Sequence, residues 1–140
     1  MPRIICLDIG TVRIGVAVSD PLGMFAQGIA VWKADSDWLS ELEKACEKYD
    51  TGCLLLGLPI REDGTIGPSA QHVQEVAAQI QERLPMVTLK FWDERYTTRV
   101  ATEYLLEANV SRKKRKKSVD KIAAAVILES YMQSEGADRF

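Results

Sequence analysis

The chain of 140 residues contains a single histidine, His72, and only three cysteines. A mechanism that needs two histidines is therefore excluded, and so are the common histidine-rich zinc sites. Cys6, Cys46 and Cys53 are odd in number and match no zinc or redox spacing, so we expect buried free thiols. Carboxylates are the chemical resource that remains.

Long apolar runs are also missing. No window approaches the ~18 uncharged apolar residues of a membrane-spanning helix, and the opening MPRIIC lacks the apolar core and cleavage site of a signal peptide. We therefore expect a cytoplasmic protein with no membrane partner. The composition, with 46% hydrophobic and 27% charged residues, is typical of globular proteins. No repeat, linker or low-complexity segment divides the sequence, so we predict a single domain over residues 1–140.

Basic charge is concentrated in one place. The run RKKRKK at 112–117 holds six of the 18 basic residues, whereas the rest of the chain is strongly acidic. A run of this kind is often only a solvated loop. On an acidic protein it is also an obvious binding site for phosphates.

Apolar and β-branched runs predict five strands, and helical spacing of apolar residues predicts four helices. The strands are expected at 3–9, 13–19, 26–33, 53–59 and 87–92. The helices are expected from Ser36 to Tyr49, from Pro68 through Leu84, from Thr97 or Thr98 to Ala108, and from Ser118 onward, after a basic loop. Since crossover connections are right-handed, this order predicts an α/β fold: a mixed five-stranded sheet, an antiparallel meander plus two parallel strands, with helices on both faces.

The stretch IICLDIGTVRIGVAVSD places Asp8 near the end of an apolar strand, where a carboxylate needs a partner. If this strand is central, Asp8 lies at the edge where open α/β sheets bind ligands. The fifth strand ends at the same edge in Asp93 and Glu94, roughly 9 to 10 Å away across two strand spacings. Gly57 on the intervening strand leaves this gap open. Because neighbours on a strand point to opposite faces, we choose Glu94 and keep Asp93 in reserve.

Asp120, which follows the expected N-cap Ser118, is the third candidate. An acid in a first helical turn is also explained by the helix dipole alone, and backbone amides of the following turn could satisfy Asp8. Together with Asp8 and Glu94, Asp120 would complete an oxygen-only site, which selects Mg²⁺ or Mn²⁺ over zinc.

The segment GLPIREDGTIGPSA superficially resembles a phosphate-binding loop but lacks the GK[ST] ending, so we expect no nucleotide cofactor. We interpret it as a loop that borders the active site, with Gly64 and Gly67 allowing tight turns and the next helix N-terminus open to a phosphate. Glu62 or Asp63 could also approach a metal. The three tryptophans, Trp32, Trp38 and Trp92, would serve either as packing or as a stacking face for bases.

Four blocks resemble, in order, the motifs of the YqgF/RuvX family: DIGTVRIGVAVSD, GLPIREDGTIGPSA, DERYTT and SVDKIAAAVILESY. The match spans nearly the full length. The opening DxGT alone is shared with sugar kinases and actin-like ATPases, but four blocks in order are highly specific. The resemblance implies a ribonuclease H-like fold and an acidic triad of Asp8, Glu94 and Asp120. Bacterial members are described as Holliday junction resolvases or as nucleases that mature the 5′ end of pre-16S ribosomal RNA.

We expect a two-metal hydrolysis, in which Asp8 bridges two Mg²⁺ or Mn²⁺ ions about 4 Å apart while Glu94 and Asp120 hold one each. A mobile basic arm would hold the nucleic-acid backbone, with other arginines closer to the metals. The expected nucleic-acid-binding residues are Arg13, Arg95, Arg99, Arg112, Lys113, Lys114, Arg115, Lys116 and Lys117. For the first three, pairing with a local acid is an equally good explanation.

Structured RNA is the favoured substrate, on the family resemblance alone, and branched DNA is the alternative. A non-catalytic RNA-binding or regulatory factor is a second alternative, because carboxylates can persist as structure. A kinase or actin-like ATPase would need a second lobe, for which 140 residues leave no room. The oligomeric state is not predicted, although symmetric cleavage of a four-way junction would favour a dimer.

Overall fold

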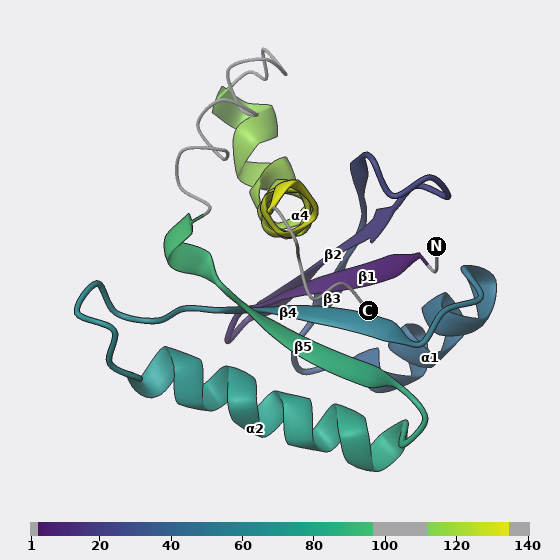
Figure 1. The fold of residues 1–140 in the computed structure, drawn as a ribbon, viewed down its shortest axis with the longest axis horizontal. Coiled ribbons are helices and arrows are strands. Elements are labelled where there is room, and N and C mark those ends of the chain that lie inside the picture. The colour runs from purple at the N-terminus through teal and green to yellow at the C-terminus, as the bar shows by residue number, and fades with distance from the viewer. Residues whose placement is uncertain (1–2, 97–111, 135–140) are drawn as a thin grey trace.

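The structure, a computed structural model, describes residues 3–96 and 112–134; for residues 96 and 112–121 it describes the backbone alone. A five-stranded sheet forms its centre, in the order β3-β2-β1-β4-β5 (Figure 1). The strands are β1 (Ile4–Ile9), β2 (Arg13–Ser19), β3 (Ala26–Lys33), β4 (Cys53–Leu58) and β5 (Thr88–Asp93). The first three form an antiparallel meander, and β1, β4 and β5 are parallel. The predicted sheet is confirmed.

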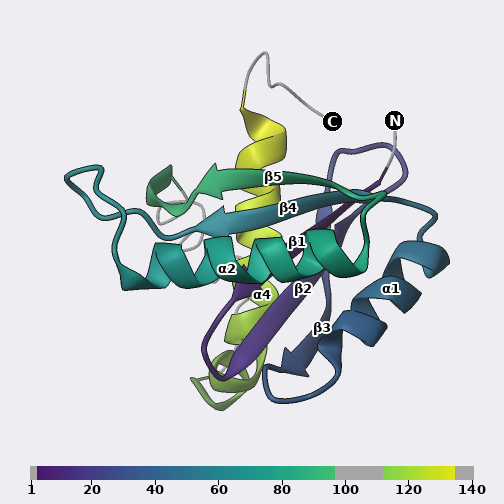
Figure 2. The same ribbon diagram turned by 90° about the horizontal axis from the view of Figure 1, so that it is seen from below.

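Helices cover both faces of this sheet, as predicted (Figure 2). The helix α4 (Arg112–Gln133) crosses one face, whereas α1 (Trp38–Lys48) and α2 (Pro68–Arg83) lie on the other. A short 3₁₀ turn, η1 (Glu94–Tyr96), follows β5. None of the helices in the described ranges is long and apolar enough to cross a membrane.

The central strand β1 is buried on both faces. Ile5 and Leu7 pack toward α1 and α2, and Ile4 and Cys6 pack toward α4. Full burial of such a side chain contributes roughly 1.5–3 kcal/mol, and a one-residue slip would exchange the two sets between faces. The register of β1 is therefore firmly set. By strand alternation, Asp8 projects from the same face as Ile4 and Cys6, the face covered by α4.

The helix starts agree only in part with the prediction. Pro68 occupies the first turn of α2 as expected, after the N-cap Gly67. The cap of α1 is Asp37 instead of Ser36: the Asp37 carboxylate accepts a hydrogen bond from the Ser40 amide. A carboxylate at the N-cap satisfies an unpaired amide and complements the helix dipole, so Asp37 is the stronger capping residue.

The prediction of a basic loop followed by a helix with Ser118 as its N-cap is wrong, because α4 begins at Arg112 and includes the whole run 112–117. Lysine and arginine are good helix formers, and no glycine or proline interrupts the segment. Asp120 therefore lies in the interior of α4 and not in its first turn. The helix expected from Thr97 or Thr98 to Ala108 lies outside the described residues.

Candidate active site

Asp8 and Glu94 come together at the carboxyl ends of β1 and β5. Figure 2 shows β4 and β5 side by side with the same direction, so that the loop after β4 and the η1 turn lie at one edge of the molecule. A side-chain hydrogen bond joins the Glu94 and Asp8 carboxyl groups. Burial, the charge of Asp8, this hydrogen bond and the charge of Asp93 together raise the pKa of Glu94 to about 7.

Cys6 lies directly behind this carboxylate pair. Its thiol is fully buried, and the pKa is raised first by burial and then by the charges of Asp8 and Glu94. Leu7, which lies between them in β1, faces α1 and α2, so Cys6 and Asp8 both face α4. The thiol is free and inert as a nucleophile, as expected from the sequence, and Cys46 and Cys53 are also free thiols but only partly buried.

Gly57 provides the space in which the Glu94 carboxyl group lies. A Cβ atom at this position would be 2.5 Å from Oε1 of Glu94 and 2.7 Å from Cδ1 of Ile127 in α4. Real Cβ atoms do not approach other heavy atoms so closely, so a larger residue would move the end of the Glu94 or the Ile127 side chain. Gly57 therefore leaves the space that the Glu94 carboxyl group occupies in this arrangement.

Asp93 has a different role from Glu94. Its carboxylate accepts hydrogen bonds from the backbone amide of Arg95 at 2.9 Å, from Nε at 2.8 Å and from the NH2 nitrogen at 2.5 Å. These contacts with Arg95 lower the pKa of Asp93. Arg95 also reaches the carbonyl oxygen of Glu62 at 3.5 Å, which links the β5 exit to the loop after β4. Of the two acids at the end of β5, Glu94 therefore faces Asp8.

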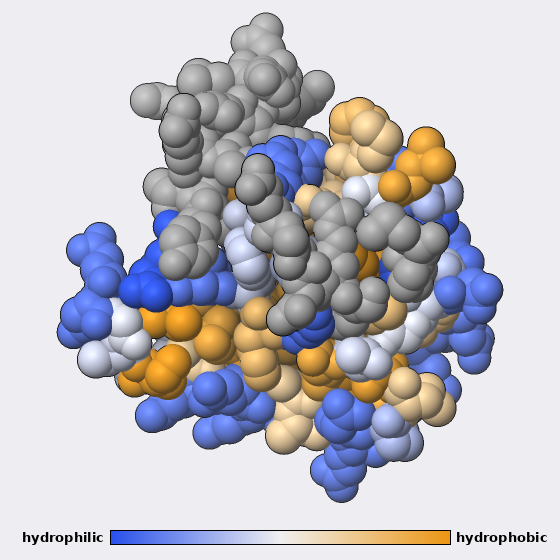
Figure 3. All heavy atoms as spheres, in the orientation of Figure 1, coloured by the Kyte–Doolittle hydropathy of each residue, from blue (hydrophilic) through white to orange (hydrophobic). Residues whose placement is uncertain are grey.

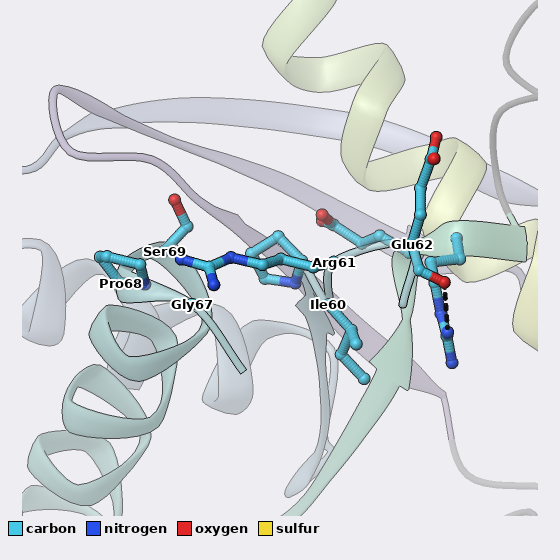
Figure 4. A pocket seen from close by; sticks show the side chains of 9 residues that line it. Ile60, Arg61, Glu62, Gly67, Pro68 and Ser69 are labelled. Atoms are coloured by element: carbon cyan, nitrogen blue, oxygen red, sulfur yellow. Dashed lines mark hydrogen bonds between the residues drawn. The ribbon is translucent and has the colours of Figure 1, made fainter. Parts of the chain in front are cut away.

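A cleft of about 520 Å³ opens beside Glu94 (Figure 4). It lies between the loop after β4, the start of α2 and η1, and both hydrophilic and hydrophobic residues face the solvent in this part of the molecule (Figure 3). The residues that line it are Pro59, Ile60, Arg61, Glu62, Gly67, Pro68, Ser69, Glu94 and Arg95. The loop closes on itself, since Asp63 accepts hydrogen bonds from the amide and hydroxyl of Thr65, and Gly64 has a φ of +87°. The interpretation of this loop as the border of the site agrees with the cleft.

The remaining candidates fall into separate groups. Asp120 lies in α4, but its side chain is outside the described part, as are the side chains of Arg112, Lys113, Lys114, Arg115, Lys116 and Lys117. Arg99 also lies outside it. Arg13 is at an exposed position at the start of β2, next to a hollow it forms with Lys33 and Asp35. Within residues 3–96 and 122–134, no three histidine, cysteine or acidic side chains are grouped as a metal site.

Two other expectations can be assigned. Arg95 pairs with Asp93, which is the local-acid alternative left open by the sequence. The tryptophans contribute to packing: Trp38 is buried, Trp32 packs against the same core, and Trp92 makes an edge-to-face contact with Tyr131 at 5.5 Å. Arg61 was not singled out from the sequence, although it lies in the loop segment identified as the site border.

Comparisons with known proteins agree with this architecture. A RuvX family profile described as Holliday junction resolvase matches residues 2–134. A Clostridium botulinum protein provisionally named pre-16S rRNA nuclease is 48% identical over 134 residues, covering 94% of this chain and 97% of that protein. A Clostridium beijerinckii protein of the same name is 46% identical over 132 residues, covering 93% of this chain and 95% of that protein.

Solved structures resemble the fold at low sequence identity. Thermus thermophilus RuvC in complex with a Holliday junction has a TM-score of 0.61 and 12% identity, with all of both chains covered. The fowlpox virus resolvase bound to junction DNA has a TM-score of 0.52 and 16% identity over 94% of this chain and 97% of that chain. These likenesses establish a resolvase-like fold. With the profile match and the relatives at 46–48% identity over nearly the whole length, the chain belongs to the RuvX family.

Proposed function

We propose that the protein is a divalent-metal-dependent endonuclease that cleaves structured RNA, and that its reaction is the processing of the 5′ end of pre-16S rRNA. The observation that carries this proposal is the pair of carboxyl groups, Asp8 and Glu94, that the sheet brings together from residues far apart in the chain. The substrate class follows from the names of the relatives at 46–48% identity.

The residues present fit a hard divalent cation. Both groups offer carboxylate oxygens, which suit Mg²⁺ or Mn²⁺ better than zinc. They are partly withdrawn from water beside a fully buried thiol, and the absence of a Cβ at Gly57 leaves room for them. Asp120 is the third proposed ligand. Its position in α4 precedes Ala124 and Ile127, both buried against this face of the sheet, by one and two helical turns.

When bound, a pair of divalent cations lowers the pKa of an attacking water and stabilises the departing oxygen of the phosphodiester. The protein's part is to hold the ligand oxygens in place. Asp8 would help to hold both ions, because β1 is the central strand of the sheet, and Glu94 and Asp120 would each hold one ion. Asp93 and Arg95 fix the turn that carries Glu94.

The substrate would be held through its phosphate backbone. The basic run 112–117 forms the first turns of α4, so its charge is carried on a helix that leads directly to position 120. Arg13 and Arg99 are proposed to contact neighbouring phosphates. Binding should therefore weaken steeply as the salt concentration rises.

The test is cleavage of precursor ribosomal RNA by the purified protein with Mg²⁺ or Mn²⁺, beside Asp8→Asn and a control variant at an exposed acid of α2, Glu75→Gln. We expect the wild type and Glu75→Gln to cleave and Asp8→Asn to be inactive. Near-normal cleavage by Asp8→Asn would refute the proposed role of the carboxylate pair.

A second candidate, resolution of four-way DNA junctions, is supported by the description of the family profile. A synthetic four-way junction in the same assay distinguishes the two candidate functions. Cleavage of the junction in preference to the RNA would make junction resolution the better-supported function. Binding of RNA without any metal-dependent cleavage would favour the non-catalytic alternative.

A further inference from the structure

Arg61 extends along the cleft next to Glu94. Figure 4 shows its side chain directed toward Gly67 and Ser69, whereas the Glu62 side chain points away from them. The guanidinium lies against Gly67: a Cβ there would be 2.7 Å from Nε and 3.0 Å from the NH2 nitrogen of Arg61. Gly67 is buried while most of this loop is exposed. Arg61 is itself exposed, and its guanidinium lies over the Gly67 backbone at the start of α2.

Three acids at or near the cleft already have partners, and a fourth, Glu62, is turned away from the Arg61 guanidinium (Figure 4). Glu94 is hydrogen-bonded to Asp8, and Asp93 is paired with Arg95. Asp63 accepts two hydrogen bonds from Thr65. Among the residues that the structure describes, the Arg61 guanidinium has neither an ion pair nor a hydrogen bond.

The two arginines of the cleft therefore differ in whether their charge is already paired with an acid. The charge of Arg95 is neutralised by Asp93 and its nitrogens are largely used, so it acts as a positioning residue for η1. Arg61 retains its full charge and its donors, within the same cavity as Glu94. The N-terminus of α2 beside Gly67 carries a partial positive charge, so it adds to the positive potential of the Arg61 guanidinium.

We propose that Arg61 is a substrate-binding residue whose guanidinium contacts a backbone phosphate of the nucleic acid adjacent to the phosphate that is cleaved. The inference rests on the proposed function and adds the cleft between the β4 loop and α2 to the path of the substrate. A planar guanidinium donates two parallel hydrogen bonds to phosphate oxygens, which gives both affinity and orientation. A lysine would retain the charge but lose this geometry.

The experiment measures binding without cleavage, in metal-free buffer, by fluorescence anisotropy of labelled precursor RNA over a series of salt concentrations. The variants are Arg61→Gln, Arg61→Lys and the control Arg83→Gln, which alters an exposed arginine at the far end of α2 that pairs with Glu43. Thermal melts of each variant check that it is folded.

We expect Arg61→Gln to weaken binding by about five- to tenfold and to reduce the slope of log K against log salt by about 0.7–0.9, the value for one phosphate contact. Arg61→Lys should retain the slope with intermediate affinity, and Arg83→Gln should match the wild type. If Arg61→Gln binds as Arg83→Gln does, the inference is overturned.

Metal-dependent cleavage measured on the same proteins separates this inference from the proposed function. Cleavage by the wild type, with binding unchanged in Arg61→Gln, would overturn the role of Arg61 alone. If binding depends on Arg61 but no cleavage occurs, the proposed nuclease function is refuted and the proposed phosphate contact is supported. A stronger effect on a four-way DNA junction than on RNA would retain the contact and change the substrate.

Discussion

Replacing Glu94 by glutamine should stabilise the metal-free protein at alkaline pH. The Glu94 carboxyl group is partly buried and lies beside Asp8, and these surroundings raise its pKa from 4.5 to about 7. Ionising it in the folded protein places two negative charges against each other. Glutamine has nearly the same shape, carries no charge, and can donate its amide hydrogen to Asp8 as the protonated acid does.

The sign follows from the direction of the pKa change. Below pH 4.5 both folded and unfolded chains hold the proton, so Glu94 carries no penalty. Between pH 4.5 and about 7 the unfolded chain releases the proton and the folded chain keeps it, so stability falls with rising pH. Above pH 7 the whole penalty is present. The pKa change corresponds to at most about 3.4 kcal/mol, which partial exposure to solvent reduces to roughly 1–2 kcal/mol.

Thermal unfolding in the presence of a chelator measures this effect. At about 3 °C per kcal/mol for a chain of this size, Glu94→Gln should melt about 3–6 °C above the wild type at pH 8. The two should melt together near pH 4.5. Glu62→Gln, a change at an exposed acid of the same cleft, is the control and should show no pH-dependent gain. An equal gain at both pH values, or none at pH 8, would refute the electrostatic account of the pair.

Three further predictions follow from the geometry. Gly57→Ala should lose about 1–3 kcal/mol of stability, measured by denaturant unfolding, because its Cβ would meet Oε1 of Glu94 at 2.5 Å; an unchanged midpoint with full cleavage activity would contradict the steric requirement. Arg95→Gln should lower kcat with little change in the salt dependence of RNA binding, since its charge is already neutralised; a reduced salt slope would instead make it a phosphate ligand. Replacing the six basic residues of 112–117 by alanine should flatten the salt dependence by several phosphate contacts, and an unchanged slope would exclude this run from binding.

The sheet could be predicted from the sequence because its order depends on strong, local signals. Continuous apolar runs such as CLLLGL specify strands buried on both faces, and their burial agrees with that expectation. Once β1 and β4 are parallel neighbours, strand alternation indicates which residues can meet at the edge. The meeting of Asp8 with Glu94, with Gly57 between them, therefore follows from period-two geometry and strand order.

The features that sequence reasoning missed depend on weaker signals. The start of α4 was placed six residues late, because a run of like charges was interpreted as a solvated loop although each of its residues favours a helix. Arg61 could not be separated from the other arginines, because its importance lies in which acids are already paired, and pairing is a property of side-chain directions in loops. An arginine in the loop that follows β4 was the only signal available in the sequence.

The carboxyl pair lies at the ends of buried strands, whereas the proposed phosphate contact lies in a surface loop. The carboxyl groups of Asp8 and Glu94 repel each other when ionised, so the chain must hold them together at a cost, and only strands anchored in a core can bear it. Leu7 and Leu56, both fully buried, precede Asp8 and Gly57 directly and supply that anchorage. The phosphate contact that we propose does not require two like charges to be held together. A guanidinium on a loop closed by its own hydrogen bonds is sufficient. The catalytic geometry that we propose therefore depends on β1, β4 and the end of β5, and the recognition that we propose depends on the loop between β4 and α2.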